Sequence, residues 1–221
     1  MLRLSPTAIN SFLWCHKQYW YRYIEKQPMI TNASMGRGLY VHSMIEAYLK
    51  GESIDVPLPA IQQWDDKDYE WVMDTAQDIL DIIKTMYIPV KFTELELSRP
   101  LNRNIEIVGK IDLILKNNII VDFKVLEEMK DTRNPLQLSM YQFLFPEGQG
   151  WEYWHFTTQT YKVLSYLREE IESVDWRKVV DDIIKEVDFE KRKNKRWCKK
   201  YCSYYNLCIK GGANDLHSKG S

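Results

Sequence analysis

The sequence has no apolar run long enough to span a bilayer, so a membrane-embedded protein is not expected. The first residues, MLRLSPTAIN, also lack the apolar core of a secretory signal peptide, and we therefore expect a reducing, cytoplasmic compartment. Neither sign of charge dominates, since the formal net charge is −1. The overall charge therefore does not indicate that the protein binds a polyanion. Without repeats or low-complexity segments, its 221 residues fit one large domain or two small ones.

Cysteine is scarce, with four residues in the chain. In a reducing compartment, cysteines are more often metal ligands or core residues than disulfides. Cys198, Cys202 and Cys208 lie close together among polar neighbours, within and just after the basic stretch 191–200, which makes core packing a poor explanation. Three close thiolates need a fourth ligand, and Cys15 is the remaining cysteine. A cysteine-only site suits an iron–sulfur cluster, with tetrahedral zinc as the alternative.

The most informative stretch that is present is 105–125, IEIVGKIDLILKNNIIVDFKV. Apolar residues occupy alternate positions on both sides of a three-residue loop at 116–118, which predicts two strands of one hairpin. The apolar face sets the register, because a slip of one residue would turn it to solvent. This register places Asp112 opposite Asp122 and brings Lys124 to the same face.

Two neighbouring carboxylates repel each other unless a cation lies between them, and a divalent cation is the usual solution. A lysine beside such a site can orient a water or neutralise charge that develops on a phosphate. An exposed hairpin face with solvated charges is the alternative reading. The agreement of parity, register and residue type favours a functional site over a solvated face.

The rest of the chain predicts further helices and strands around this hairpin. We expect helices over 5–23, 38–51, 62–86, 136–145 and 174–193, strands over 91–98, 151–157 and 161–167, and a loop over 26–37. Trp71 is expected on the buried side of its helix. Glu94 and Glu96 alternate with apolar residues in a strand; either could face the charged side of the hairpin, but a solvated face is the favoured expectation. This order of elements suggests a mixed sheet with helices against it.

Taken together, these pieces resemble the RecB-type nucleases of the PD-(D/E)xK superfamily, with the CRISPR-associated and phage RecB-like iron–sulfur exonucleases and the AddB nuclease domain as the nearest likeness. The matching residues are Cys15, Gly38, His42, Asp112, Asp122, Lys124, Gln137, Tyr141, Cys198, Cys202 and Cys208. Two departures stand out. Asp122 replaces the glutamate common at its place, and the tail spacing is C-x3-C where many relatives have C-x2-C.

The resemblance implies metal-assisted phosphodiester hydrolysis. The implied catalytic residues are Lys124, Asp112, Asp122, Gln137 and Tyr141, and the implied ligands of Mg²⁺ or Mn²⁺ are His42, Asp112, Asp122 and the carbonyl of Phe123. Lys124 would assist the attacking water, while Gln137 and Tyr141 would line the DNA path and orient Lys124 or the substrate phosphate. The four cysteines would hold a structural [4Fe-4S] cluster that joins the first helix to the C-terminal tail.

The implied fold is α/β (α+β), a restriction-endonuclease-like mixed central sheet flanked by helices, with the N- and C-terminal segments joined by the cysteine-ligated cluster. We expect residues 1–210 to form one nuclease domain, with a cluster subdomain around a core at 36–190, and 211–221 to be a flexible tail. The expected activity is a DNA exonuclease that prefers single-stranded ends. It would serve recombination, repair or CRISPR adaptation in a prokaryotic or phage-infected cell.

Two other functions stay open. The net charge near zero suits a DNA-binding or adaptor subunit of a recombination or CRISPR-adaptation complex, whose nuclease activity is minor or depends on a partner, because tight autonomous DNA binding usually needs a more basic surface. A sequence-specific endonuclease on the same fold is the third possibility. A requirement for free DNA ends would exclude it.

Overall fold

The computed structural model describes residues 1–29, 33–58, 66–129, 135–186, 189, 198–199 and 202–214. The chain forms two compact units. Met1–Pro6 and Asn32–Trp176 form one, which we call the sheet unit, and Thr7–Thr31 with Arg177–Ser221 form the other, which we call the cysteine unit. Within the described ranges, no helix is both long and apolar enough to cross a membrane.

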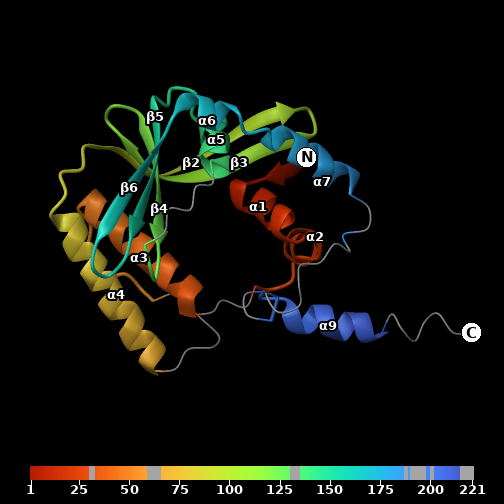
Figure 1. Ribbon diagram of the computed structural model, residues 1–221, viewed down its shortest axis with the longest axis horizontal. Helices are drawn as coiled ribbons and strands as arrows, with labels where there is room; N and C mark the ends of the chain where they lie inside the picture. The colour runs from red at the N-terminus through yellow and green to blue at the C-terminus, as the bar shows by residue number, and fades with distance from the viewer. Residues whose placement is uncertain are drawn as a thin grey trace, which may run out of the picture. The chain divides into compact units, whose positions relative to one another are not determined.

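A mixed sheet of six strands forms the centre of the sheet unit (Figure 1). The strands are β1 (Leu2–Leu4), β2 (Val90–Asn102), β3 (Ile105–Leu115), β4 (Ile119–Val125), β5 (Gly150–Phe156) and β6 (Tyr161–Tyr166). Their order is β1-β3-β4-β5-β6, with β2 paired to β3. The pairs β1–β3 and β4–β5 are parallel and the others antiparallel. The predicted mixed sheet is confirmed, whereas β1 was missed because three residues are too short to show an alternation.

The β3–β4 hairpin has the register that the apolar parity predicts. Leu113 pairs with Val121, and Ile114 pairs with Ile120. The turn closes through Asn118, whose φ of 62° lies in the left-handed region that asparagine tolerates. The predicted hairpin is therefore confirmed.

The long strand β3 is paired differently along its two edges. On one edge β2 follows it along its whole length. On the other edge β1 pairs with residues 105–107 and β4 with residues 113–114. On this second edge, between β1 and β4, no described strand pairs with residues 108–112. This interval leaves room for side chains to reach the backbone of β3.

Helices cover both faces of the sheet. Helices α3 (Ala33–Lys50) and α4 (Asp66–Lys84) lie side by side against one face, as Figure 1 shows, where they bury alternate residues of β3 and β4 such as Leu113, Val121 and Phe123. Helix α5 (Leu136–Leu144) contacts the intervening residues of β4 from the opposite face. The short helix α6 (Arg168–Glu172) follows β6. Burial of these aliphatic faces is the main force that holds the layers together.

Two details of the helical layer differ from prediction. Helix α3 begins at Ala33, so the expected loop over 26–37 is wrong in its second half; Gly36 and Arg37 are buried helical residues there. Trp71 of α4 is 37% exposed rather than buried, and the Arg37 guanidinium lies 4.1 Å above its ring. The Trp71 ring therefore covers a buried cation instead of joining the aliphatic core.

The cysteine unit contains the first helices of the chain and the last. Its elements are α1 (Pro6–Trp14), α2 (His16–Tyr19), the π-helical turn η1 (Trp20–Ile24), α7 (Trp176–Lys185) and α9 (Tyr205–Asn214). The expected single helix over 5–23 is wrong, because Cys15 is extended, with φ −164° and ψ 116°. Neither glycine nor proline marks this break. Helix α9 reaches Asn214, past the start of the tail expected at 211–221; residues 215–221 lie outside the described ranges.

We predict that Val121→Ala lowers the free energy of unfolding by about 2 kcal/mol, because it removes fully buried methyl groups and leaves a cavity in the core. Urea denaturation measures the change. The matched control is Val163→Ala in β6, where the valine is 38% exposed and the loss stays under about 0.5 kcal/mol. Equal losses for the two variants would contradict this assignment of the core.

Candidate active site

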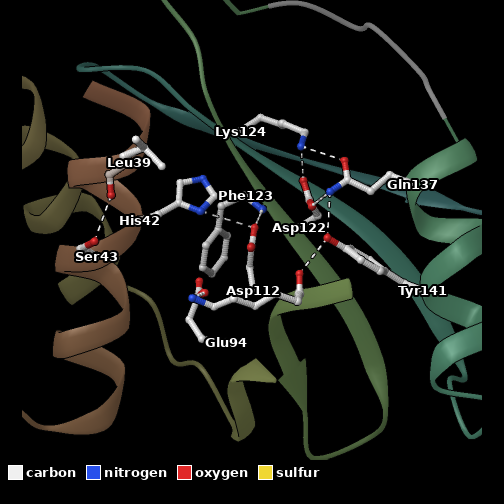
Figure 2. Close-up of polar contacts among 11 residues, drawn as sticks. Leu39, His42, Ser43, Glu94, Asp112, Asp122, Phe123, Lys124, Gln137 and Tyr141 are labelled. Carbon is white, nitrogen blue, oxygen red and sulfur yellow. Dashed lines mark hydrogen bonds and ion pairs between the residues drawn. The ribbon is translucent and has the colours of Figure 1, made fainter. Parts of the chain in front are cut away.

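The candidate site lies where β3 and β4 separate beyond their short ladder (Figure 2). Backbone groups that lose a ladder partner need another one. The Phe123 N–H donates to Asp112 Oδ2 at 2.7 Å, and the Lys110 carbonyl accepts a hydrogen bond from the Tyr141 hydroxyl at 2.8 Å. Side chains thus replace ladder bonds at this point, and the carboxylate of Asp112 is held between the two strands.

Three candidate metal ligands gather on one side of this opening: His42 of α3, Glu94 of β2 and Asp112 of β3. One ligand atom from each lies within 4.8 Å of the other two, and the described residues hold no second group of this kind. His42 Nδ1 lies 3.6 Å from Asp112 Oδ2. Carboxylate oxygens favour Mg²⁺ and Mn²⁺, and an imidazole nitrogen adds affinity for the transition metal. The donor set therefore fits a divalent cation.

Glu94 is the site residue that the sequence analysis missed, since it was expected on a solvated face. The flanking pairs of the β2–β3 ladder place it across from Asp112, and its side chain is only 11% exposed. Its φ of 49° is uncommon for a residue other than glycine. Glu96, which has the same parity, lies across from Lys110 and is exposed. Only the register of β2 against β3 distinguishes the two glutamates.

On the other side of the opening, two residues of β4 meet two residues of α5. Lys124 Nζ contacts Asp122 Oδ2 and donates to Gln137 Oε1 at 3.1 Å. Gln137 Nε2 donates to Asp122 Oδ1 at 2.5 Å and to the Tyr141 hydroxyl at 2.9 Å. The amide of Gln137 therefore has its oxygen on the ammonium and its nitrogen on the two oxygen acceptors. Lys124, Asp122 and Tyr141 together fix the orientation of the Gln137 amide, and this amide in turn helps to hold the Lys124 ammonium.

The charges of the site are out of balance. Burial lowers the pKa of His42 to about 4, so its imidazole is neutral at pH 7 and able to bind a metal. Burial, together with the charge of Asp122, raises the pKa of Asp112 well above its usual value. Burial also opposes the charge on Lys124, but Asp122 and Asp112 outweigh it and raise the pKa of this lysine. The site thus holds a protonated lysine and an unfavourable pair of carboxylates, which a divalent cation would relieve.

The four cysteines line one cavity of about 190 Å³ in the cysteine unit. Tyr21, Tyr204, Tyr205 and Ile209 supply much of the apolar part of its wall. Cys15 reaches the cavity from the break between α1 and α2, and burial raises the pKa of the Cys202 thiol to about 11. The structure therefore brings together the four thiols that the sequence singles out.

The family model of the PD-(D/E)XK nuclease superfamily matches residues 3–209. The chain belongs to the PD-(D/E)XK nuclease superfamily. No curated protein matches the sequence at a significant level.

Two solved structures have the fold of this PD-(D/E)XK nuclease. A protein of Eubacterium rectale that is assigned as an exonuclease has a TM-score of 0.63 and 14% identity, over 94% of this chain and 87% of that one. The crystal structure of SSO0001 has a TM-score of 0.55 and 17% identity, over 94% of this chain and 86% of that one. At such identities the likeness concerns the fold alone.

The predicted site residues of this nuclease surround the opening between β3 and β4. They are His42, Asp112, Asp122, Lys124, Gln137 and Tyr141. Phe123 contributes its N–H to Asp112, whereas the ligand role of its carbonyl stays a prediction. The unit that carries these residues spans Asn32–Trp176, and the cysteines lie in the other unit.

We predict that Asp112→Asn stabilises the protein in EDTA at pH 7 by about 1 kcal/mol or more, because it removes a buried charge beside Asp122. The raised pKa of Asp112 means that wild type loses stability as the pH rises from about 4, the value in an unfolded chain, through the folded value. The gain of the variant is therefore present at neutral pH and absent below about pH 4. Urea denaturation at several pH values measures it.

The matched control is Asp122→Asn, which makes the same chemical change one strand away. It removes the ion-pair partner of Lys124, so stability should fall rather than rise. Destabilisation by both substitutions at pH 7 would contradict the charge imbalance at Asp112.

Proposed function

We propose that this nuclease is a Mg²⁺- or Mn²⁺-dependent exonuclease that hydrolyses DNA from free ends, prefers single-stranded ends, and acts in recombination, repair or CRISPR adaptation. The observation that carries the proposal is the group of His42, Glu94 and Asp112, which stands beside the protonated Lys124 on a nuclease fold. The exonuclease assignment of the Eubacterium rectale protein supports the choice of reaction.

A divalent cation would polarise the phosphate and lower the pKa of a bound water. His42, Glu94 and Asp112 would hold it, and the family resemblance adds Asp122 and the Phe123 carbonyl as further ligands. The polar atoms of the first three already lie close together before any cation binds. The ion would therefore require little rearrangement of this side of the site.

The chain's own residues would position the reactants. Lys124 is protonated and 38% exposed at its side chain, so it can donate a hydrogen bond to the attacking water or to a phosphate oxygen. Gln137 holds the ammonium in place from α5. Tyr141 ties the same helix to the backbone of β3, which keeps the distance between the two sides of the opening constant.

We predict that Lys124→Ala reduces the degradation of end-labelled single-stranded DNA by at least about a hundredfold with either Mn²⁺ or Mg²⁺. The matched control is Lys116→Ala, which removes an exposed lysine in the β3–β4 turn and leaves the rate unchanged. A comparison of 5′ and 3′ labels gives the polarity, and closed circular DNA should resist cleavage.

Three outcomes would contradict the proposal in different ways. Full activity of Lys124→Ala would exclude the proposed role of the site. Cleavage of closed circular DNA at fixed positions would favour an endonuclease. Intact folding of wild type without any degradation would favour the DNA-binding or adaptor role, and a search for a partner would follow.

We also propose that Cys15, Cys198, Cys202 and Cys208 hold a structural [4Fe-4S] cluster rather than zinc. Their cavity of about 190 Å³ far exceeds the roughly 15 Å³ that one water needs, so it has room for a group of several atoms. Tetrahedral zinc brings thiolates to about 3.8 Å from each other. Among the described residues, the thiols do not form a group with all sulfurs within 4.8 Å. This wider spacing favours a cluster, whose thiolates bind different iron atoms.

We predict that the protein, purified anaerobically, is brown and contains iron, and that Cys202→Ser loses the colour and most of the iron. Cys202 is one of the four thiols that line the cavity, and a serine hydroxyl is a much weaker ligand of iron than a thiolate. Ser203→Ala and Asp112→Ala should keep the colour, while only Asp112→Ala loses DNA cleavage. A colourless wild-type protein with one equivalent of zinc would contradict the cluster.

A further inference from the structure

Lys110 is a charged residue of the site for which the proposed reaction has no role. Its ammonium contacts the carboxylate of Glu94, one of the three candidate metal ligands. The two partners differ in exposure, since the side chain of Glu94 is 11% exposed and that of Lys110 is 48% exposed. The carboxylate is therefore fixed near His42 and Asp112, whereas the ammonium reaches it from the solvent side.

A divalent cation on Glu94 would compete with this ammonium. Burial of the Glu94 carboxylate raises its pKa, and the charge of Lys110 partly compensates for that burial. In return, the hydrogen bond to Glu94 raises the pKa of Lys110. Once a divalent cation takes the carboxylate, Lys110 loses its partner and meets a like charge, which repels it. Metal binding should thus release the side chain of Lys110.

A released Lys110 has a groove to enter. A cavity of about 540 Å³ is lined by Lys110 together with Arg3, Ser5, Glu96, Leu97, Ser98, Val108 and Gly109. It follows β1, β2 and β3 next to the opening that carries the site. Arg3 has Nε paired with Glu106 at 2.9 Å and keeps further guanidinium N–H groups, and Ser98 has a hydroxyl. Both can donate hydrogen bonds, which suits the oxygens of a phosphate.

The backbone of Lys110 stays in place during such a movement. Its carbonyl accepts the hydrogen bond of Tyr141, so the main chain is tied to α5 while the half-exposed side chain is free to turn. Glu96, directly opposite Lys110 in the ladder, is the competing partner that could capture the ammonium inside the groove. A phosphate and Glu96 are therefore the two destinations that an experiment must separate.

We propose that Lys110 is a phosphate-binding residue that metal binding releases: it neutralises Glu94 until a divalent cation displaces it, and it then binds the sugar-phosphate backbone of the substrate strand in the groove of β1, β2 and β3. This inference rests on the proposed nuclease function and deepens it. It makes tight DNA binding conditional on a loaded metal site. An enzyme built in this way would hold few strands that it cannot cleave.

The first test measures metal binding without DNA. Isothermal titration calorimetry with Mn²⁺ on the full-length protein should show that Lys110→Met binds the ion about three- to tenfold more tightly than wild type, because the competing internal cation is gone. Lys116→Met, the same change at the exposed β3–β4 turn, should leave the affinity unchanged. Equal Mn²⁺ affinities for wild type and Lys110→Met would overturn the proposal.

The second test measures DNA binding without cleavage. Fluorescence anisotropy of a labelled single-stranded oligonucleotide should show tighter binding by wild type in Ca²⁺ than in EDTA. Lys110→Met should lose about three- to tenfold in Ca²⁺ and little in EDTA, and the slope of log affinity against log salt should fall by about 0.7, as for one phosphate contact. Lys110→Arg keeps the charge and should retain the affinity.

Two further outcomes would overturn the proposal. A loss of the same size in Ca²⁺ and EDTA would mean that Lys110 binds DNA independently of the metal. Changed Mn²⁺ affinity with unchanged DNA affinity would mean that the released ammonium turns to Glu96. Wild type that neither binds nor degrades DNA would instead refute the proposed function, so the two failures are distinguishable.

Discussion

The separation of β3 and β4 is the constraint on which the site depends. The two strands pair only over a short ladder, and the backbone groups beyond it must find other partners. The Asp112 carboxylate accepts the Phe123 N–H and the Tyr141 hydroxyl donates to the Lys110 carbonyl, so the residues that compensate for the lost ladder are also those of the site. This arrangement places the candidate metal ligands of α3, β2 and β3 on one side of the opening. Lys124 of β4 and its hydrogen-bond partner Gln137 of α5 lie on the other side.

The same arrangement concentrates charges that disfavour each other. Asp112 is buried beside Asp122, and Glu94 is buried as well, so the carboxylates of this site oppose folding unless cations accompany them. Lys124 and Lys110 are the cations that the chain itself supplies. A divalent ion would neutralise part of the carboxylate charge that these lysines now neutralise. Metal binding would therefore weaken the ion pairs that hold the two lysine side chains. Buried charges of this kind lower the free energy of unfolding, and they are kept because the reaction needs them.

Much of the fold and of the site could be predicted from local patterns. The alternation of apolar residues over 105–125 gave the correct hairpin register, because only one register buries all of them. Gln137 and Tyr141, four residues apart, had to share a helix face. Glu94 could not be separated from Glu96 by parity, and the break of the first helix at Cys15 has no glycine or proline to signal it. Trp71 was misassigned because its partner, Arg37, is distant in sequence.

By itself, the sequence determined where the strands β2 to β6 form and which of their faces is apolar, because these properties depend on periodicity. It also determined which acids, lysine and cysteines are available for chemistry, because that depends on residue type. Tertiary structure alone decided which glutamate of β2 joins His42 and Asp112, since this depends on the pairing of β2 with β3. It also decided that Lys110 faces Glu94 and borders a groove, because both follow from how β1, β2 and β4 share the edges of β3.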